Sequence, residues 1–306
     1  MMRVLVAIDG SAPAALALDL VADIDWPGGT TIRIAQAIET ASGSFGGPWP
    51  SIALIETDKL EADLLAEAER NVVDGRVRLE RPGLTIESAV LHGRPSSAIV
   101  SEARAVGADL IVVGSRGHGT IESMLLGSVS VEVIDHSPIP VLVARRRGLG
   151  RVVLAWDGSS CASRAADLVC RWPIFCRAEV HVLAVAEIAV PWWTGFPEPG
   201  SPELMPMYIE AANASRQERN ELADEMTRRL EAAGLRVEED HREGDAATQI
   251  LAAAREWTAD MIVLGTHGRT GLARLVIGAV ARNVLHHAPC SILIVPERTP
   301  DPAPAG

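Results

Sequence analysis

The stretch ADLIVVGSRG at residues 108–117 decides the fold, because a short apolar run of strand character ends at the first glycine of a tight loop. The same chemistry returns 151 residues later as ADMIVLGTHG at residues 259–268. In both copies nine residues then lead to a third glycine, Gly127 or Gly278. Three glycines at fixed offsets after a buried strand, the last at an expected helix start, allow backbone N–H groups to approach an anion closely. The recurrence in register predicts two related anion-binding loops.

The register extends along the chain and indicates a duplicated unit. Asp9-Gly-Ser and Asp157-Gly-Ser each follow the first apolar run of a half, 148 residues apart. A unit of about 150 residues is an ordinary domain length. We therefore expect one domain over residues 1–147, a second over 148–296 and a disordered Pro/Ala-rich tail over 297–306.

The composition is typical of a soluble globular protein, with 48% apolar residues and a net charge of −12. This acidic balance argues against nucleic-acid binding, which needs clustered basic side chains. The run Arg145–Arg147 is the exception, and we interpret it as a solvated linker between the halves. The sequence shows neither an apolar span of membrane length nor a signal-peptide pattern, so we expect a cytoplasmic location without membrane contact.

Cysteine and lysine usage exclude several classes of site. The four cysteines show no CxxC pair and no zinc-ligand spacing, so we expect free thiols in a reducing compartment and no metal held by the protein. Lys59 is the only lysine of the chain, and no Gly-Lys-Ser/Thr sequence exists, which excludes a P-loop. Its neighbours are typical of a solvated helix start rather than of a Schiff-base or kinase lysine.

Strand-like and helical segments alternate in both halves, which predicts an α/β fold with five-stranded parallel sheets and right-handed crossovers. In the first half we expect strands at 3–8, 31–38, 84–91, 109–114 and 140–144, helices at 12–23, 57–79, 96–106 and 128–136, and a loop at 39–56. In the second half we expect strands at 151–156, 178–186, 235–241, 260–265 and 291–295, and a loop at 191–206. The expected helices are one between the first two of these strands and others at 208–233, 246–257 and 279–287. The aspartates and glycine loops then share the carboxyl edge of each sheet, where ligands bind in open α/β folds.

Taken together, these motifs resemble the universal stress protein family in its tandem, two-domain form. They are an aspartate after strand one, Gly93-Arg-Pro before helix three, and G-x2-G-x9-G-S/T after strand four. The resemblance covers residues 2–296 and implies Rossmann-like, adenine nucleotide alpha hydrolase-like domains that bind ATP, or ADP or AMP, with Mg²⁺. It also implies a stress-response sensor or regulator with little or no turnover and an unidentified protein partner. The halves are expected to pair through their fifth strands as an internal pseudo-dimer, and pairing of whole chains is a weaker expectation.

The resemblance assigns roles residue by residue. In the first half it places Asp9 near the adenosine, the Ala37 backbone at the adenine, and Gly114, Gly117, Gly127, Ser128, Val129 and Ser130 around the phosphates. In the second half the corresponding residues are Asp157, Val185, Gly265, Gly268, Gly278, Ala279 and Val280. There Ala279 and Ala281 stand where Ser128 and Ser130 supply hydroxyls, so we expect a weaker second site.

Other interpretations of the same residues stay open at this stage. The glycine loops could be tight turns of an interaction scaffold, and Asp9 and Asp157 could be N-caps of helices beginning at Gly10 and Gly158. Slow ATP hydrolysis is a further alternative, although no residue stands out as a general base. His118 and His267 lie in the loops without a nucleophile elbow, a paired carboxylate or a His–Cys cluster at a consistent position. We therefore interpret them as loop histidines that are solvated or contact a phosphate. An ATP-pyrophosphatase would need Ser-Gly-Gly-x-Asp-Ser after strand one, which is absent.

Overall fold

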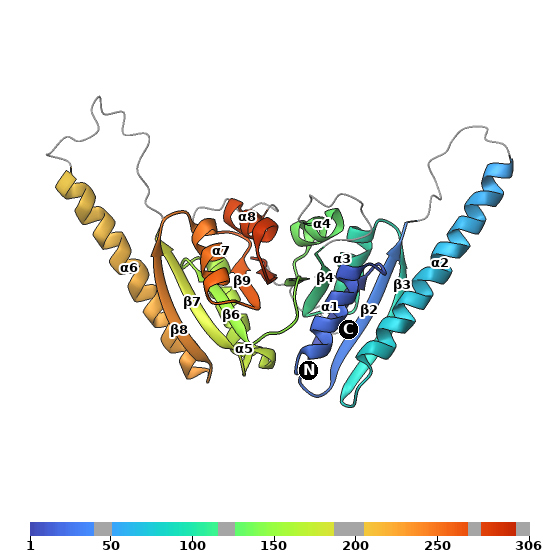
Figure 1. The fold of residues 1–306 in the computed structure, drawn as a ribbon, viewed down its shortest axis with the longest axis horizontal. Coiled ribbons are helices and arrows are strands. Elements are labelled where there is room, and N and C mark those ends of the chain that lie inside the picture. The colour runs from blue at the N-terminus through green and yellow to red at the C-terminus, as the bar shows by residue number, and fades with distance from the viewer. Residues whose placement is uncertain (40–50, 116–125, 187–204, 269–276, 298–306) are drawn as a thin grey trace, which may run out of the picture.

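The computed structural model describes residues 1–39, 51–115, 126–186, 205–268 and 277–297, and consists of two α/β halves of the same design (Figure 1). The first half contains β1 (Arg3–Ile8), α1 (Ala12–Asp23), β2 (Thr30–Ile38), α2 (Ser51–Leu79), β3 (Leu84–His92), α3 (Pro95–Ala105), β4 (Leu110–Gly114), α4 (Ser128–His136) and β5 (Val141–Ala144). The second half contains β6 (Arg151–Trp156), α5 (Ser160–Arg171), a short 3₁₀ helix (Pro173–Phe175), β7 (Glu179–Ala186), α6 (Met205–Ala232), β8 (Arg236–Glu243), α7 (Ala246–Glu256), β9 (Met261–Gly265), α8 (Ala279–His287) and β10 (Ser291–Val295).

All ten strands form one sheet, in the order β3-β2-β1-β4-β5-β10-β9-β6-β7-β8. Neighbours within each half run parallel, as the alternation of strands and helices predicts. The two halves meet where β5 pairs antiparallel with β10, with Leu142 opposite Leu293. The expected pairing of the halves through their fifth strands is therefore present in the structure.

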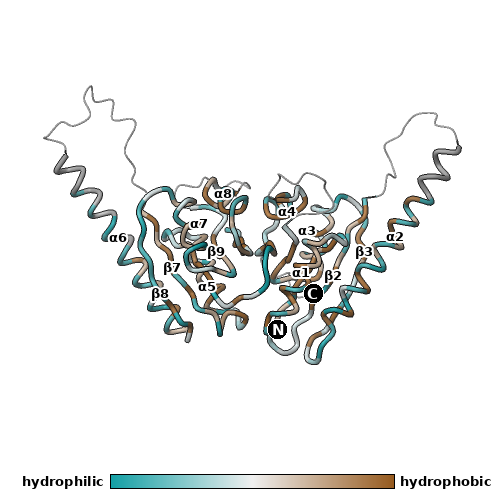
Figure 2. The backbone as a smooth tube through the Cα atoms, in the orientation of Figure 1, coloured by the Kyte–Doolittle hydropathy of each residue, from teal (hydrophilic) through white to brown (hydrophobic). Residues whose placement is uncertain are grey.

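Helices cover both faces of the sheet. In β1, Val4 and Val6 point into the core beneath α1 and α2, whereas Leu5 and Ala7 point into the core beneath α3 and α4. Alternate residues of each inner strand are thus buried on opposite faces, which explains why these strands are continuous apolar runs. Both cores extend across the β5–β10 junction into the second half. Figure 2 shows apolar residues on the inner strands and more hydrophilic stretches along the outer strand β8 and helix α6.

The structure places the starts of two long helices earlier than expected. Helix α6 begins at Met205, three residues before the expected start and within the loop expected over residues 191–206, the rest of which lies outside the described residues. Helix α2 begins at Ser51, so the loop expected over residues 39–56 is six residues shorter at that end. The Ser/Gly/Pro content that predicted a loop lies mainly before Pro50. Of the expected tail, residues 297–306, only Glu297 lies within the described residues. Among the described helices, none is both long and apolar enough to cross a bilayer.

Arg146 and Arg147 are exposed, as expected for a solvated linker, but the interpretation is wrong for Arg145. Arg145 lies half-buried and donates to the carbonyl oxygens of Ala288, at 2.6 Å, and Leu285, at 2.5 Å. These carbonyls belong to the last turn of α8 and the residue after it, and such groups lack partners within the helix. The side chain therefore caps α8 from the linker.

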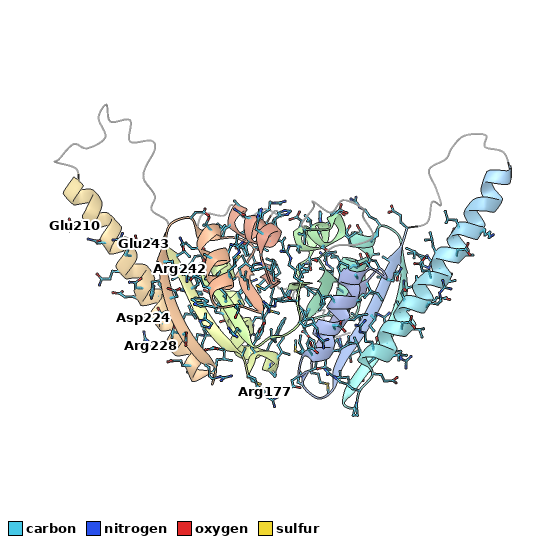
Figure 3. The ribbon with its side chains drawn as sticks, viewed as in Figure 1. Arg177, Glu210, Asp224, Arg228, Arg242 and Glu243 are labelled. Carbon is cyan, nitrogen blue, oxygen red and sulfur yellow. The ribbon has the colours of Figure 1, made fainter. Side chains whose placement is uncertain are left out.

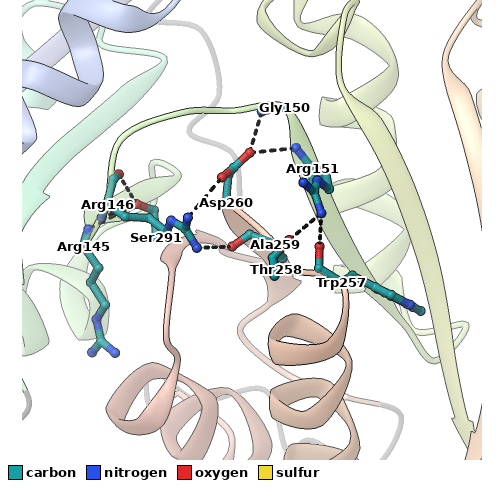
Figure 4. Close-up of polar contacts among 9 residues, drawn as sticks. All are labelled: Arg145, Arg146, Gly150, Arg151, Trp257, Thr258, Ala259, Asp260 and Ser291. Carbon is teal, nitrogen blue, oxygen red and sulfur yellow. Dashed lines mark hydrogen bonds and ion pairs between the residues drawn. The ribbon is translucent and has the colours of Figure 1, made fainter.

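The rest of the linker is held in the same way (Figure 4). Arg146 donates to the carbonyl oxygen of Ala259 at 3.2 Å, and the Ser291 hydroxyl donates to the carbonyl of Arg146 at 2.9 Å. One carboxylate oxygen of Asp260 accepts the N–H groups of Gly150 and Arg151, each at 2.9 Å. A sequence that is basic in composition thus folds against the carbonyls and carboxylates of the second half.

Candidate functional site

The turn after β1 has the same conformation in both halves. Asp9 Oδ1 accepts the N–H of Ser11 at 3.0 Å, and Gly10 adopts a φ of +79° that side chains rarely tolerate. The Ser11 hydroxyl oxygen then accepts the N–H of Ala14 at 3.3 Å as the N-cap of α1. The second half repeats this arrangement with Asp157, Gly158, Ser159 and Ala162. The aspartates are therefore not the N-caps, as one interpretation held; they shape the turn, and the serines cap the helices.

The first glycine of each motif is required by close packing. Gly114 is buried at the end of β4, and a Cβ there would lie 2.8 Å from the carbonyl carbon of Pro13 in α1. Gly265 at the end of β9 would collide in the same way with Cys161 in α5. These two glycines thus have a structural role that is independent of any ligand.

The third glycine begins the helix after the loop. Gly127 is the N-cap of α4 and donates its N–H to the carbonyl of Ser115 at 2.8 Å. Gly278 is the N-cap of α8 and donates to the carbonyl of Thr266 at 2.7 Å. The helix start is therefore fixed directly beyond the end of the fourth strand. Because glycine has no side chain, it supplies no capping oxygen of its own to the first-turn N–H groups.

The two serine hydroxyls of the first half have different surroundings. Ser130 is buried and donates to the carbonyl oxygen of Gly114 at 2.8 Å, which ties α4 to the end of β4. Ser128 and Val129, in the first turn of α4, are exposed. In the second half Ala279 is exposed and Ala281 is buried, so α8 has no hydroxyl for the matching bond to Gly265.

Helix α4 is also held by the motif Gly93-Arg-Pro. Arg94 Nη2 lies 2.6 Å from Glu132 Oε1, and the Ser96 hydroxyl donates to Glu132 Oε2 at 2.6 Å. The hydroxyl of Ser96, followed by the guanidinium of Arg94, lowers the pKa of the Glu132 carboxyl. This motif therefore positions α4 through Glu132. In the second half Asp245 instead caps α7 by accepting the N–H of Thr248 at 2.8 Å.

A polar pair that the sequence analysis missed lies beside the aspartate turn. The amide of Asn71 in α2 donates to Gln36 Oε1 near the end of β2 at 3.0 Å, and its Nδ2 lies 2.7 Å from the position of a Cβ on Gly10. Ala37, the next residue of β2, is half-buried at the same edge of the sheet. Helical spacing in α2 indicates only which face is apolar, so it could not reveal a partner 35 residues away.

Asn71 of this pair borders a small pocket between α1 and α2. The pocket has a volume of about 130 Å³ and its lining includes Gly10, Ser11, Asn71, Asp74 and Arg78. In the second half the residue at the position of Asn71 is Leu222, whose Cδ1 lies 3.1 Å from a Cβ placed on Gly158. The side chain that faces the glycine of the aspartate turn is therefore polar in one half and apolar in the other.

The second half shows how the middle glycine of the motif meets the aspartate turn. Gly268 is exposed, and a Cβ there would lie 2.8 Å from Asp157 Oδ2. His267 Nδ1 lies 3.1 Å from the Thr266 hydroxyl, and its ring is half-buried. Val185 and Val280 are half-buried near the same edge. Gly117 and His118 of the first half lie outside the described residues.

Comparison with known proteins agrees with this arrangement. The model of the universal stress protein family matches the chain twice, over residues 1–145 and 148–296. The chain belongs to the universal stress protein family. A universal stress protein of Methanocaldococcus jannaschii is 30% identical over 145 residues, which are 47% of this chain and 81% of that protein. One from Mycobacterium tuberculosis is 26% identical and covers 98% of this chain and 96% of its own length.

Solved structures show the same tandem fold. The crystal structure of a universal stress protein from Archaeoglobus fulgidus superposes with a TM-score of 0.66 at 20% sequence identity. The match covers 96% of this chain and 98% of that chain. The similarity therefore extends over both halves of this universal stress protein.

Proposed function

We propose that the first half of this universal stress protein binds an adenine nucleotide, ATP or its products ADP and AMP, at the carboxyl edge of the sheet. The observation that carries the proposal is the start of α4. Gly127 places the helix N-terminus directly beyond β4, and Ser128 and Val129 of the first turn are exposed there. Partial positive charge at a helix N-terminus and unsatisfied N–H groups favour a phosphate.

The assignment of the base and sugar rests on the family resemblance and on the neighbouring turn. Asp9 follows β1 and Ala37 lies near the end of the adjacent parallel strand β2, so both share one edge of the sheet with the start of α4. Asp9 holds the turn by accepting the Ser11 N–H, and Asn71 and Gln36 add polar groups beside it. We propose that Mg²⁺ accompanies the triphosphate and is held by phosphate oxygens and water, because Asp9 is already used in shaping the turn.

We propose that the bound nucleotide acts as a signal rather than as a substrate for rapid turnover, in a cytoplasmic regulator that acts on an unidentified protein partner. Nucleotide can shift the protein between conformations only if one of them binds it more tightly. An interaction scaffold is the competing function, and the packing of Gly114 against Pro13 favours it, since this glycine is needed without any ligand.

A negative charge introduced at position 127 distinguishes nucleotide binding from the scaffold function. This residue has a φ of −74°, which any side chain can adopt, and Asp is a good N-cap. Gly127→Asp should keep α4 folded but oppose a phosphate, and we expect MgATP affinity to fall at least about ten-fold. The isosteric Gly127→Asn caps the helix without the charge and is the matched control.

The measurement is titration calorimetry with MgATP, together with native mass spectrometry of the protein as purified. Retained nucleotide and a selective effect of Gly127→Asp would support binding. If the wild-type protein neither retains nucleotide nor binds MgATP, the scaffold function takes its place.

A further inference from the structure

The structure brings three metal-binding side chains together at the carboxyl edge of the second half. Cys161 lies in the first turn of α5, His267 follows β9 by two residues, and Glu297 follows β10 by two residues. One ligand atom from each lies within 4.8 Å of the other two. The residues are 106 and 30 positions apart in the sequence, so no spacing motif could reveal them. The expectation of no His–Cys cluster is therefore wrong for Cys161 and His267, whose ligand atoms lie within 4.8 Å of each other.

We propose that Cys161, His267 and Glu297 form a binding site for a zinc ion. A thiolate, an imidazole and a carboxylate are the ligand types that Zn²⁺ takes, whereas Mg²⁺ and Ca²⁺ prefer oxygen ligands alone. In a tetrahedral zinc site the ligand atoms are roughly 3.3–3.8 Å apart, so small side-chain movements would close the present cluster around an ion. Three protein ligands leave a fourth position for water or another ligand, as in open zinc sites.

The surroundings of the cluster support the assignment. Cys161 is buried, so its sulfur lies in a fixed place rather than on the surface. The Thr266 hydroxyl lies 3.9 Å from Cys161 Sγ and 3.1 Å from His267 Nδ1, so it contacts two of the three proposed ligands. Groups of this kind orient the ligands of metal sites.

The first half provides an internal comparison. At the positions of Cys161, His267 and Glu297 it has Pro13, Arg116 and Arg146, none of which binds a metal. Arg146 instead donates to the carbonyl of Ala259. The ligand set is therefore a property of the second half alone, and it includes a residue of the GTHG loop.

Two other clusters of possible ligands lie toward the β8 end of the sheet. One is Glu179, His181 and Glu238, and the other is Asp224, Glu239 and His241. Neither contains a thiol, and in each the histidine faces a glutamate, with His241 Nε2 only 2.6 Å from Glu239 Oε1. Figure 3 shows Asp224 on α6 among other charged side chains of that outer surface. A metal ion bound at either of these clusters would have no sulfur ligand. An experiment that detects thiolate ligation therefore distinguishes them from the Cys161 site.

The test is titration of the full chain with Co²⁺, whose spectrum reports both thiolate ligation and tetrahedral geometry. The parent protein should be Cys176→Ser, because Cys176 is exposed and could bind cobalt at the surface. We expect one equivalent of Co²⁺ to give a thiolate charge-transfer band and tetrahedral visible bands, and Zn²⁺ to displace it. Cys161→Ser should abolish the charge-transfer band, and Cys170→Ser is the matched control that should retain it.

Glu297→Gln tests the site without altering the buried cysteine. Gln keeps the size of the side chain but removes the carboxylate, so we expect cobalt affinity to fall at least about ten-fold with unchanged circular dichroism. The proposal is overturned if the parent protein shows no thiolate band, if the band survives in Cys161→Ser, or if Glu297→Gln binds cobalt as the parent does. Binding that persists without the band, and is lost on His181→Ala or His241→Ala, would assign the metal to the β8 end instead.

Discussion

Arg147 donates two hydrogen bonds to Asp23, from Nε to Oδ2 at 2.6 Å and from Nη2 to Oδ1 at 2.5 Å. The pair joins the linker between the halves to the last residue of α1. The Arg147 guanidinium lowers the pKa of the Asp23 carboxyl, mainly through these hydrogen bonds. The geometry is bidentate, which is the most favourable arrangement for such a pair, although both side chains are partly exposed.

This pair makes a pH-dependent contribution to stability. A carboxyl group whose pKa is lower in the folded than in the unfolded protein stabilises the fold above the unfolded pKa. That contribution is lost as the pH falls from about 4 through the lower folded value. Asp23→Asn should therefore lower the melting temperature slightly at pH 7, and the difference from wild type should vanish under acid conditions.

The matched control is Asp25→Asn, which removes a more exposed partner of Arg177. We expect it to have the smaller effect in calorimetric melting at pH 7. An Asp23→Asn difference that grew as the pH fell would contradict the assignment.

Capping by Arg145 predicts a stability loss in the second half from a mutation in the linker. Arg145→Ala leaves the carbonyls of Leu285 and Ala288 without these donors, and we expect a cost of about 1.5–3 kcal/mol in the free energy of unfolding. Hydrogen exchange should increase at the end of α8. Arg255→Ala, at an exposed position in the last turn of α7, is the control. Unchanged hydrogen exchange in α8 would show that Arg145 does not stabilise the end of this helix.

Pairing of β5 with β10 predicts that the separated halves associate. Each half alone would leave a buried, apolar strand edge open, either Val141–Ala144 or Ser291–Val295. Residues 1–147 and 148–306, expressed separately, should form heterodimers when mixed, or homodimers and aggregates alone. Sedimentation velocity distinguishes these outcomes, and Leu142→Asp in the first fragment should prevent association. A stable monomer of residues 1–147 at high concentration would falsify the pairing.

The different environments of Ser128 and Ser130 predict that the two hydroxyls have separable effects. Ser128→Ala should weaken MgATP binding by about 1.5–3 kcal/mol if the exposed hydroxyl meets a charged oxygen, with little change in stability. Ser130→Ala should cost about 0.5–1.5 kcal/mol of stability, because its bond to the Gly114 carbonyl is lost. Calorimetric titration and chemical denaturation measure the two effects.

The second half supplies the reverse experiment. Ala279→Ser should tighten nucleotide binding at the second site, measured with the first site blocked by Gly127→Asp. If the two sites already bind equally, the expected asymmetry is wrong and other groups of the second loop replace the hydroxyl.

Much of the fold could be predicted from the sequence because its signals are local. Buried runs such as Leu110–Gly114 show strands directly, and the repeat fixed the number and order of elements in both halves. Pairing of β5 with β10 also agreed with expectation, but that expectation came from the family resemblance rather than from a local signal. The expected start of α2 is wrong because the Ser/Gly/Pro-rich composition of the preceding segment led to a loop prediction that includes residues 51–56, which are helical.

The site was predicted less completely because its decisive contacts join distant residues. The role of Ser130 depends on Gly114 across the loop, and Asn71 meets Gln36 from another element. The role of Arg145 was not predicted because charge alone does not show that the carbonyls at the end of α8 lie within reach. Residue types and repeats predict which polar groups a site can use. Only the folded structure shows which of those groups already form hydrogen bonds with each other.

Because β5 and β10 belong to one polypeptide, the contact between the halves forms at any dilution and always joins unlike partners. In a dimer of identical chains, every substitution appears twice. Here one copy can keep Ser128 and Ser130 while the other replaces them with alanine and gains Cys161, His267 and Glu297. Covalent joining thus lets a repeated scaffold carry two different sets of side chains in a fixed one-to-one ratio.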